Sequence, residues 1–129
     1  MIDIVRDDGD NTNDFVKTKS KTYWSRIYIA GDINAAKQTC RELTNDMGLC
    51  VTVKPSTYIY SGGCEEGLEI GLLVYPRFEK SVERVKEATS KLADLLMLEL
   101  HQKTCLTVDH SDTVLITRKL KGERDDGVL

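Results

Sequence analysis

The chain has few of the residues that bind metals, close disulfides or cross membranes. It holds two histidines, and its four cysteines, Cys40, Cys50, Cys64 and Cys105, are far apart and form no Cys-x-x-Cys pair. A zinc site is therefore not expected, and the cysteines are predicted to be free thiols. No apolar run approaches the roughly 18 residues that a membrane-spanning helix requires. The first residues, MIDIVRDDGDNTND, lack the apolar stretch of a signal peptide, so we expect a protein that stays in the cytoplasm.

An excess of basic charge is also missing. Lys and Arg number 18 against 21 Asp and Glu, which gives a net charge of −3 and a pI near 5.4. Phosphate contacts need clustered Lys and Arg, and this balance argues against a general nucleic-acid-binding protein. The 129 residues, 40% of them hydrophobic, fit one soluble domain with a modest core.

The apolar pattern predicts a single domain over residues 22–119, between an N-terminal tail (1–21) and a C-terminal tail (120–129). Both tails are polar, and we expect them to be disordered or loosely ordered. Within the domain, alternating or helical periodicity predicts strands at 24–30, 49–60, 68–74, 105–108 and 114–117, and helices at 33–47 and 81–102. Pro55 is expected to interrupt the second strand, and Ser61-Gly62-Gly63 is expected to form the turn after it.

This β-α-β-β-α-β order with an extra C-terminal strand predicts an α+β, ferredoxin-like fold, in which both helices cover one face of an antiparallel sheet. The other face would still carry apolar residues, among them Leu73, Tyr75 and Trp24 or its neighbours. A small domain usually buries such a face against copies of itself. We therefore expect an oligomer, with a trimer whose sheets face inward as the common solution.

Residues 57–76, TYIYSGGCEEGLEIGLLVYP, contain three glutamates between strand-like runs. Alternation places Glu69 on the face opposite Leu68, Ile70, Leu72 and Val74. Two interpretations of Glu69 stay open: a rim glutamate that is solvated or paired with Lys or Arg, and a carboxylate that binds ligand hydroxyls or a positive centre. Glu65 and Glu66 are expected at the hairpin tip, where a solvated turn competes with a role in ligand binding.

The neighbouring residues allow a structural and a functional interpretation in the same way. Tyr58 and Tyr60 share one face of their strand, where tyrosines more often pack than catalyse. The segment Ser61-Gly62-Gly63 can hold a phosphate or carboxylate through backbone N–H groups, although the signal is weak. Cys64 has no nearby base in the sequence and is not expected to be a nucleophile, and Arg77 is either an anion anchor or a surface arginine.

The order of these features resembles the small phage-encoded S-adenosylmethionine lyases, formerly called S-adenosylmethionine hydrolases, over residues 24–117. The positions that carry the resemblance are Gly48-Leu49, Thr57, Gly63-Cys64, Glu65-Glu66 and Cys105. The loop before the third strand is shorter here than in the best-known member of the family. Glu65, Glu66 and Glu69 therefore remain alternatives for the essential carboxylate, and the strand register favours Glu69, with Tyr58 opposite it.

The resemblance implies an enzyme similar in fold to the trimeric PII-type signalling proteins, with its sites between subunits. It implies cleavage of S-adenosylmethionine to methylthioadenosine and homoserine lactone in the host bacterial cytoplasm, with no metal or cofactor, so that restriction systems lose their methyl donor. Tyr58 and Glu69 would be catalytic, and the remaining substrate-binding residues would be Val53, Pro55, Tyr60, Ser61, Gly62, Gly63, Glu65 and Glu66. The alternative is a non-catalytic, PII-like oligomer that binds or sequesters a nucleotide-type signal. A protein-binding inhibitor with no small-molecule ligand is a third possibility.

Overall fold

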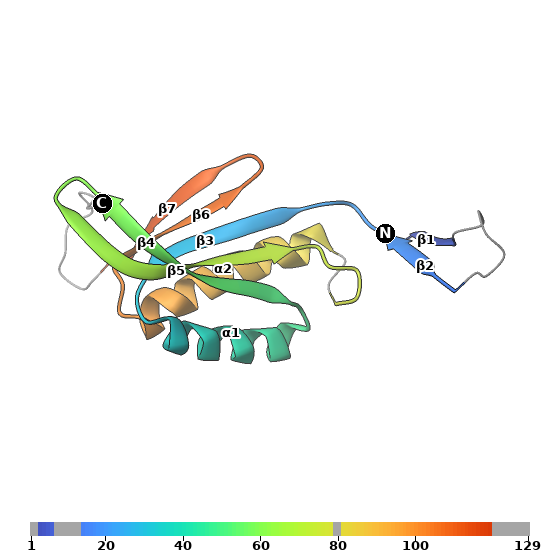
Figure 1. The fold of residues 1–129 in the computed structure, drawn as a ribbon, viewed down its shortest axis with the longest axis horizontal. Helices are drawn as coiled ribbons and strands as arrows, with labels where there is room; N and C mark the ends of the chain where they lie inside the picture. The colour runs from blue at the N-terminus through green and yellow to red at the C-terminus, as the bar shows by residue number, and fades with distance from the viewer. Residues whose placement is uncertain (1–2, 7–13, 79–80, 120–129) are drawn as a thin grey trace.

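The structure is a computed structural model that describes residues 3–6, 14–78 and 81–119 (Figure 1). Its elements in chain order are β1 (Asp3–Arg6), β2 (Val16–Lys19), β3 (Trp24–Ala30), α1 (Ile33–Met47), β4 (Val51–Tyr60), β5 (Gly63–Leu73), α2 (Val82–Glu99), β6 (Thr104–Asp109) and β7 (Thr113–Thr117). Neither α1 nor α2 is long and apolar enough to cross a membrane.

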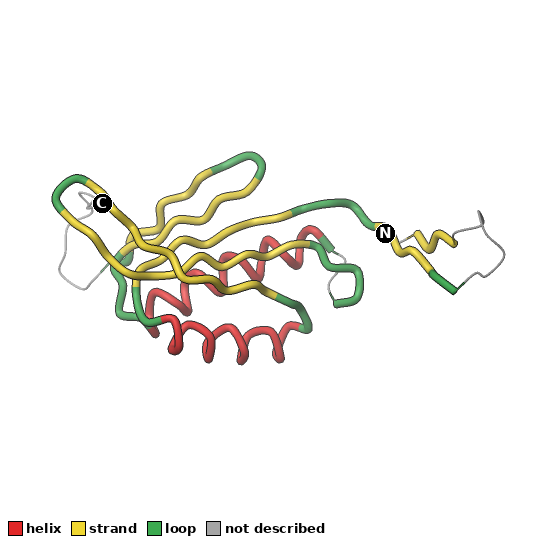
Figure 2. The backbone as a smooth tube through the Cα atoms, viewed as in Figure 1, coloured by secondary structure: helices red, strands yellow, loops and turns green. Residues whose placement is uncertain are grey.

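The main sheet has five antiparallel strands in the order β4-β5-β3-β6-β7. Helices α1 and α2 lie side by side on one face of this sheet (Figure 2). The strands β3 to β6 and the two helices follow the β-α-β-β-α-β order, and β7 adds a strand beyond β6. The predicted α+β, ferredoxin-like fold is therefore confirmed.

The core lies between the sheet and the helices, as the apolar periodicity predicts. On β5, Leu68, Ile70 and Leu72 face the helices and are at most 2% exposed. The buried stripe of α1 comprises Ala36, Thr39, Cys40, Leu43 and Met47, and that of α2 comprises Val85, Ala88, Thr89, Leu92, Ala93, Leu96 and Met97. All four cysteines are free.

The helix ends are set by capping residues. The side chain of Asp32 accepts a hydrogen bond from the Ala35 N–H at 3.1 Å and caps α1 at its N-terminus. Gly48 ends the same helix with a φ of 67°, in the left-handed region that favours glycine. Ser81 caps α2 by accepting a hydrogen bond from the Arg84 N–H.

The hairpin of β4 and β5 is longer than expected, and two predictions about it are wrong. Pro55 does not interrupt the strand, because β4 is the edge of the sheet, where a residue without an N–H is tolerated. Glu65 and Glu66 are not in the turn: β5 begins at Gly63, and the turn is confined to Ser61 and Gly62. The glutamates and glycines of this segment obscure the apolar alternation that would have extended the predicted strand.

The described part of the N-terminal tail holds regular structure that the sequence did not predict. Strands β1 and β2 pair antiparallel and form a two-stranded sheet separate from the main one, which stands away from the helices and main sheet (Figure 1). Strand β2 is VKTK with all four side chains exposed, so no apolar pattern marks it. The prediction for residues 120–129 lies outside the described residues.

Candidate functional site

The face of the main sheet that the helices leave uncovered, called here the open face, carries half of the predicted site residues. Residues that are directly paired across antiparallel strands point to the same face. Lys54 of β4 pairs with Glu69 of β5, and Glu69 in turn pairs with Tyr28 of β3. Alternation adds further members, and the open face at this end of the sheet comprises Arg26, Tyr28, Lys54, Tyr58, Tyr60, Glu65 and Glu69.

Glu69 lies between two cations. Its Oε2 is 3.0 Å from Nζ of Lys54 and 3.9 Å from Nε of Arg26. The side chain of Glu69 is 16% exposed, whereas those of Lys54 and Arg26 are 65% and 48% exposed. The carboxylate is thus held near the surface by partners that remain in water. Exposed ion pairs of this kind contribute little to stability, so a ligand can exchange for either partner.

Tyr58 is half-buried, and its ring lies against the neighbouring strand β5 at Gly67. Its hydroxyl donates a hydrogen bond to the carbonyl oxygen of Leu68. Its ring covers Gly67, where an added Cβ would meet the ring at 2.8 Å and the Ile29 carbonyl oxygen at 2.3 Å, so only glycine fits this position. Burial, above all, raises the pKa of Tyr58, and the charge of Glu69 adds to the rise. Tyr58 therefore acts as a neutral hydroxyl donor.

The outer part of the hairpin holds a second tyrosine and the other two glutamates. The Tyr60 hydroxyl donates to Oε1 of Glu65 at 2.8 Å, on the open face. Glu66 lies on the opposite side, where both of its oxygens accept from the Thr57 hydroxyl, at 3.1 and 3.0 Å. The two adjacent glutamates therefore face different surroundings, and Glu65 alone of the two shares a face with Glu69.

The structure brings together part of the predicted set. Tyr58, Tyr60, Gly63, Glu65 and Glu69 share the open face. Val53 and Pro55 pair with Ile70 and Leu68 and so face the helix side, where only their backbone groups remain candidates. Ser61 and Gly62 lie at the far end of the hairpin.

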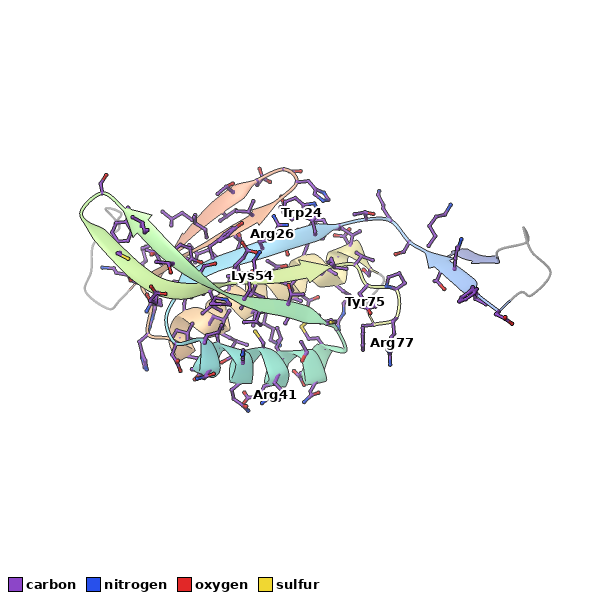
Figure 3. The ribbon with its side chains drawn as sticks, in the orientation of Figure 1. Trp24, Arg26, Arg41, Lys54, Tyr75 and Arg77 are labelled. Carbon is purple, nitrogen blue, oxygen red and sulfur yellow. The ribbon has the colours of Figure 1, made fainter. Side chains whose placement is uncertain are left out.

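The prediction that Tyr58 lies opposite Glu69 is wrong, because Tyr58 pairs with Glu65 and Glu69 pairs with Lys54. Lys54 and Arg26 are the neighbours of Glu69 that the sequence analysis missed. A two-residue turn at Ser61 and Gly62 places Lys54 directly opposite Glu69, so a correct turn assignment would have identified this pair. Arg26 comes from β3 (Figure 3), whose pairing with β5 is not encoded in any local pattern. The Arg26 guanidinium also lies 4.7 Å from the centre of the Trp24 ring.

Two hollows in the described part of the chain lie on the helix side, one beside α1 and β4, the other beside α2, β6 and β7. Tyr58, Tyr60, Glu65 and Glu69 line neither hollow, whereas Val53 lines the first. Within the described ranges no group of three His, Cys, Asp or Glu side chains is placed to hold a metal ion.

Comparison with known proteins finds solved structures that resemble this chain in fold. No family model and no curated protein matches the sequence. A phage SAM lyase in complex with S-methyl-5'-thioadenosine is 13% identical, with a TM-score of 0.53 over 78% of this chain and 92% of that one. A phage SAM lyase in the apo state is also 13% identical, with a TM-score of 0.58 over 76% of this chain and 90% of that one. The periplasmic divalent cation tolerance protein CutA from Archaeoglobus fulgidus is 17% identical, with a TM-score of 0.42 over 78% of this chain and 89% of that one. At these identities the likeness to SAM lyase establishes the fold.

Proposed function

We propose that this protein is an S-adenosylmethionine lyase that produces methylthioadenosine and homoserine lactone. The observation that carries the proposal is the fold likeness to two phage SAM lyase structures, which spans about nine-tenths of their length. The open face adds support, because it gathers Tyr58 and Glu69 on adjacent strands of one hairpin. These are the residues that the predicted strand register favours for catalysis among the alternatives that the resemblance leaves open.

The reaction needs no group beyond the substrate itself. A carboxylate oxygen of the methionine arm attacks the γ-carbon, and the bond from that carbon to sulfur breaks. The electron pair goes to sulfur, so that the sulfonium leaves as the neutral thioether of methylthioadenosine. The remaining arm closes as homoserine lactone, and neither water nor a cofactor is consumed.

The protein contributes orientation and a dry environment. Folding the flexible arm so that oxygen and γ-carbon approach in line uses the large effective molarity of intramolecular groups, on the order of 10⁵ M or more. A carboxylate and a sulfonium disappear together along this path. A water-poor site therefore favours the reaction, because water stabilises the separated charges of the substrate more than the products.

The site residues have distinct roles in this proposal. Glu69 accepts hydrogen bonds from the ribose hydroxyls or from the ammonium of the substrate. Tyr58 fixes the arm through its neutral hydroxyl, and its ring face favours the sulfonium. The other substrate contacts come from Tyr60 and Glu65, which share the open face, and from backbone groups of residues 53–55 and 61–63. Glu66 faces the other way and has no role in this site. If water attacked instead of the carboxylate, a general base would be required, and Glu69 is the candidate.

The proposed site lies between subunits of a trimer. The open face exposes Leu73, Leu106 and Leu115 by 47%, 36% and 46%. In the described part of the chain, residues 57–65 of the hairpin have strand partners only within the hairpin, since the pairing of β3 with β5 ends at Gly67 and is followed by one hydrogen bond from the Gly31 N–H to the Glu66 carbonyl oxygen. Ile59 in this segment is 81% exposed, although it faces the helix side rather than the open face. A solitary hairpin is marginally stable in water, so a second copy that covers this face would stabilise the hairpin and exclude water from Glu69.

In its biological setting, the proposed enzyme is phage-borne and acts in the host cytoplasm. Removal of S-adenosylmethionine would deprive restriction-modification systems of the methyl donor that many of them use. The enzyme would therefore act as an anti-restriction protein without contacting DNA, in agreement with the net charge of −3.

The test is incubation of the purified protein with S-adenosylmethionine, followed by chromatography. The expected result is methylthioadenosine at a rate far above the spontaneous decay in a protein-free control, and loss of that activity in Glu69→Ala. Binding of a nucleotide ligand without turnover would instead support the non-catalytic PII-like alternative. Absence of both turnover and binding would refute both functions.

A further inference from the structure

Three charged side chains form a row across the middle of the open face. Arg26 on β3, Glu69 on β5 and Lys54 on β4 alternate in sign, with distances of 3.9 and 3.0 Å from Glu69 Oε2 to Arg26 and Lys54. The row therefore offers one acceptor group between two groups of donors. A ligand that matches it carries an anion and a cation close together.

The strand register fixes this row. Lys54 is directly opposite Glu69, and Arg26 is opposite Gly71, two residues further along β5. Because Gly71 has no side chain, Arg26 has room to lean along the strand toward Glu69. An added Cβ at this position would lie 2.5 Å from Thr52 Oγ1, so a larger residue would require the exposed Thr52 side chain to move. The guanidinium of Arg26 also stacks over the indole ring of Trp24, with 4.7 Å between Cζ and the ring centre.

We propose that this row recognises an α-amino-acid headgroup, with Lys54 and Arg26 binding its carboxylate and Glu69 binding its ammonium. The inference rests on the proposed function, because it takes the methionine arm of S-adenosylmethionine as the headgroup. Binding then exchanges ion pairs. The ammonium of the ligand replaces Lys54 as the nearest partner of Glu69, and the carboxylate of the ligand pairs with Lys54 and Arg26. Since Lys54 is 65% exposed and Arg26 48% exposed, the pairs that are broken are weak ones.

Recognition of both ends of the headgroup fixes the arm in space. A carboxylate held through one oxygen by Lys54 or Arg26 keeps its second oxygen for attack on the γ-carbon. The same contacts discriminate against ligands that lack the carboxylate or the ammonium. Lys54 and Arg26 are thus positioning residues, and their removal should weaken substrate binding more than it slows the chemical step.

The test compares two probes that differ in the headgroup, S-adenosylhomocysteine, which has it, and methylthioadenosine, which lacks it. Their dissociation constants are measured by calorimetry for the wild type, for Lys54→Met and for the control Lys37→Met, in which the exposed lysine lies on α1. Lys54→Met should weaken S-adenosylhomocysteine binding at least tenfold and change methylthioadenosine binding less than twofold. The control should change neither, and far-UV circular dichroism checks that each variant is folded.

The outcomes separate this inference from the proposed function. An equal loss for both probes in Lys54→Met, no loss for either, or no binding by the wild type would overturn the inference. Weakened binding of ADP in Lys54→Met, with S-adenosylhomocysteine unaffected, would make the row a phosphate site and also overturn it. A selective loss of S-adenosylhomocysteine binding in Lys54→Met, with no turnover of S-adenosylmethionine by the wild type, would support the headgroup site and refute the lyase activity. Turnover of S-adenosylmethionine with an unchanged KM in Lys54→Met would support the lyase activity and refute the headgroup site.

Discussion

Glu69→Gln should separate the role of the carboxylate in activity from its role in the fold. Glutamine keeps the shape of the side chain but removes the charge that Lys54 and Arg26 face at 3.0 and 3.9 Å. Both cations remain largely in water, so the loss in folding stability should stay within about 1 kcal/mol. Charge-assisted hydrogen bonds to a substrate are worth roughly 1.5–3 kcal/mol, which corresponds to about a ten- to hundredfold loss in kcat/KM.

The assay pairs methylthioadenosine production with thermal unfolding of the same samples. Glu69→Gln should lose activity while its melting temperature changes little, and Glu69→Ala should lose more activity. Glu66→Gln is the matched control, because Glu66 lies on the opposite side of the same strand and bonds to Thr57. An active Glu69→Gln beside an inactive Glu66→Gln would refute the carboxylate assignment.

Three further predictions concern the open face and the β6–β7 turn. Tyr58→Phe removes only the hydroxyl and should lower kcat/KM about tenfold; an unchanged value would assign Tyr58 to packing alone. Gly67→Ala brings a methyl group within 2.3 Å of the Ile29 carbonyl oxygen, and should lower the free energy of unfolding by at least about 1–3 kcal/mol in denaturant titration. Hydrogen bonds from the backbone N–H groups of Asp112 and Ser111 and from the Tyr23 hydroxyl lower the pKa of Asp109 below its ordinary value of 3.8. These bonds to the carboxylate stabilise the folded state above that ordinary pKa, and the stabilisation should be lost as pH falls below it. Thermal unfolding across this range should show a weaker acid dependence in Asp109→Asn, and an identical profile would contradict the assignment.

The sequence predicts elements whose signals are local. The stripe in α1, the cap at Asp32 and the left-handed Gly48 lie within one stretch of chain, so β3 and both helices are close to the predicted ranges. Burial of Leu68, Ile70 and Leu72 also follows from strict alternation.

The register of the long hairpin could not be predicted with the same success. Placing the turn at three residues instead of Ser61 and Gly62 leaves the partner of every residue on β4 uncertain, since a shift by one position moves side chains to the other face. Alternation along β5 therefore predicts the face of Glu69 correctly, but it does not predict the register that makes Lys54 its partner. Arg26 is harder still, because it meets Glu69 through pairing of β3 with β5, more than 30 residues away in the chain.

The most direct measurement of the central claim is the product of S-adenosylmethionine turnover in ¹⁸O-labelled water. The proposed lyase reaction uses the substrate's own carboxylate, so the lactone trapped early in the reaction should appear together with methylthioadenosine and carry no ¹⁸O by mass spectrometry. Homoserine that carries ¹⁸O from the first time point, without a lactone precursor, would show attack by water. If no more product forms than in the protein-free control, the proposed enzymatic activity is contradicted.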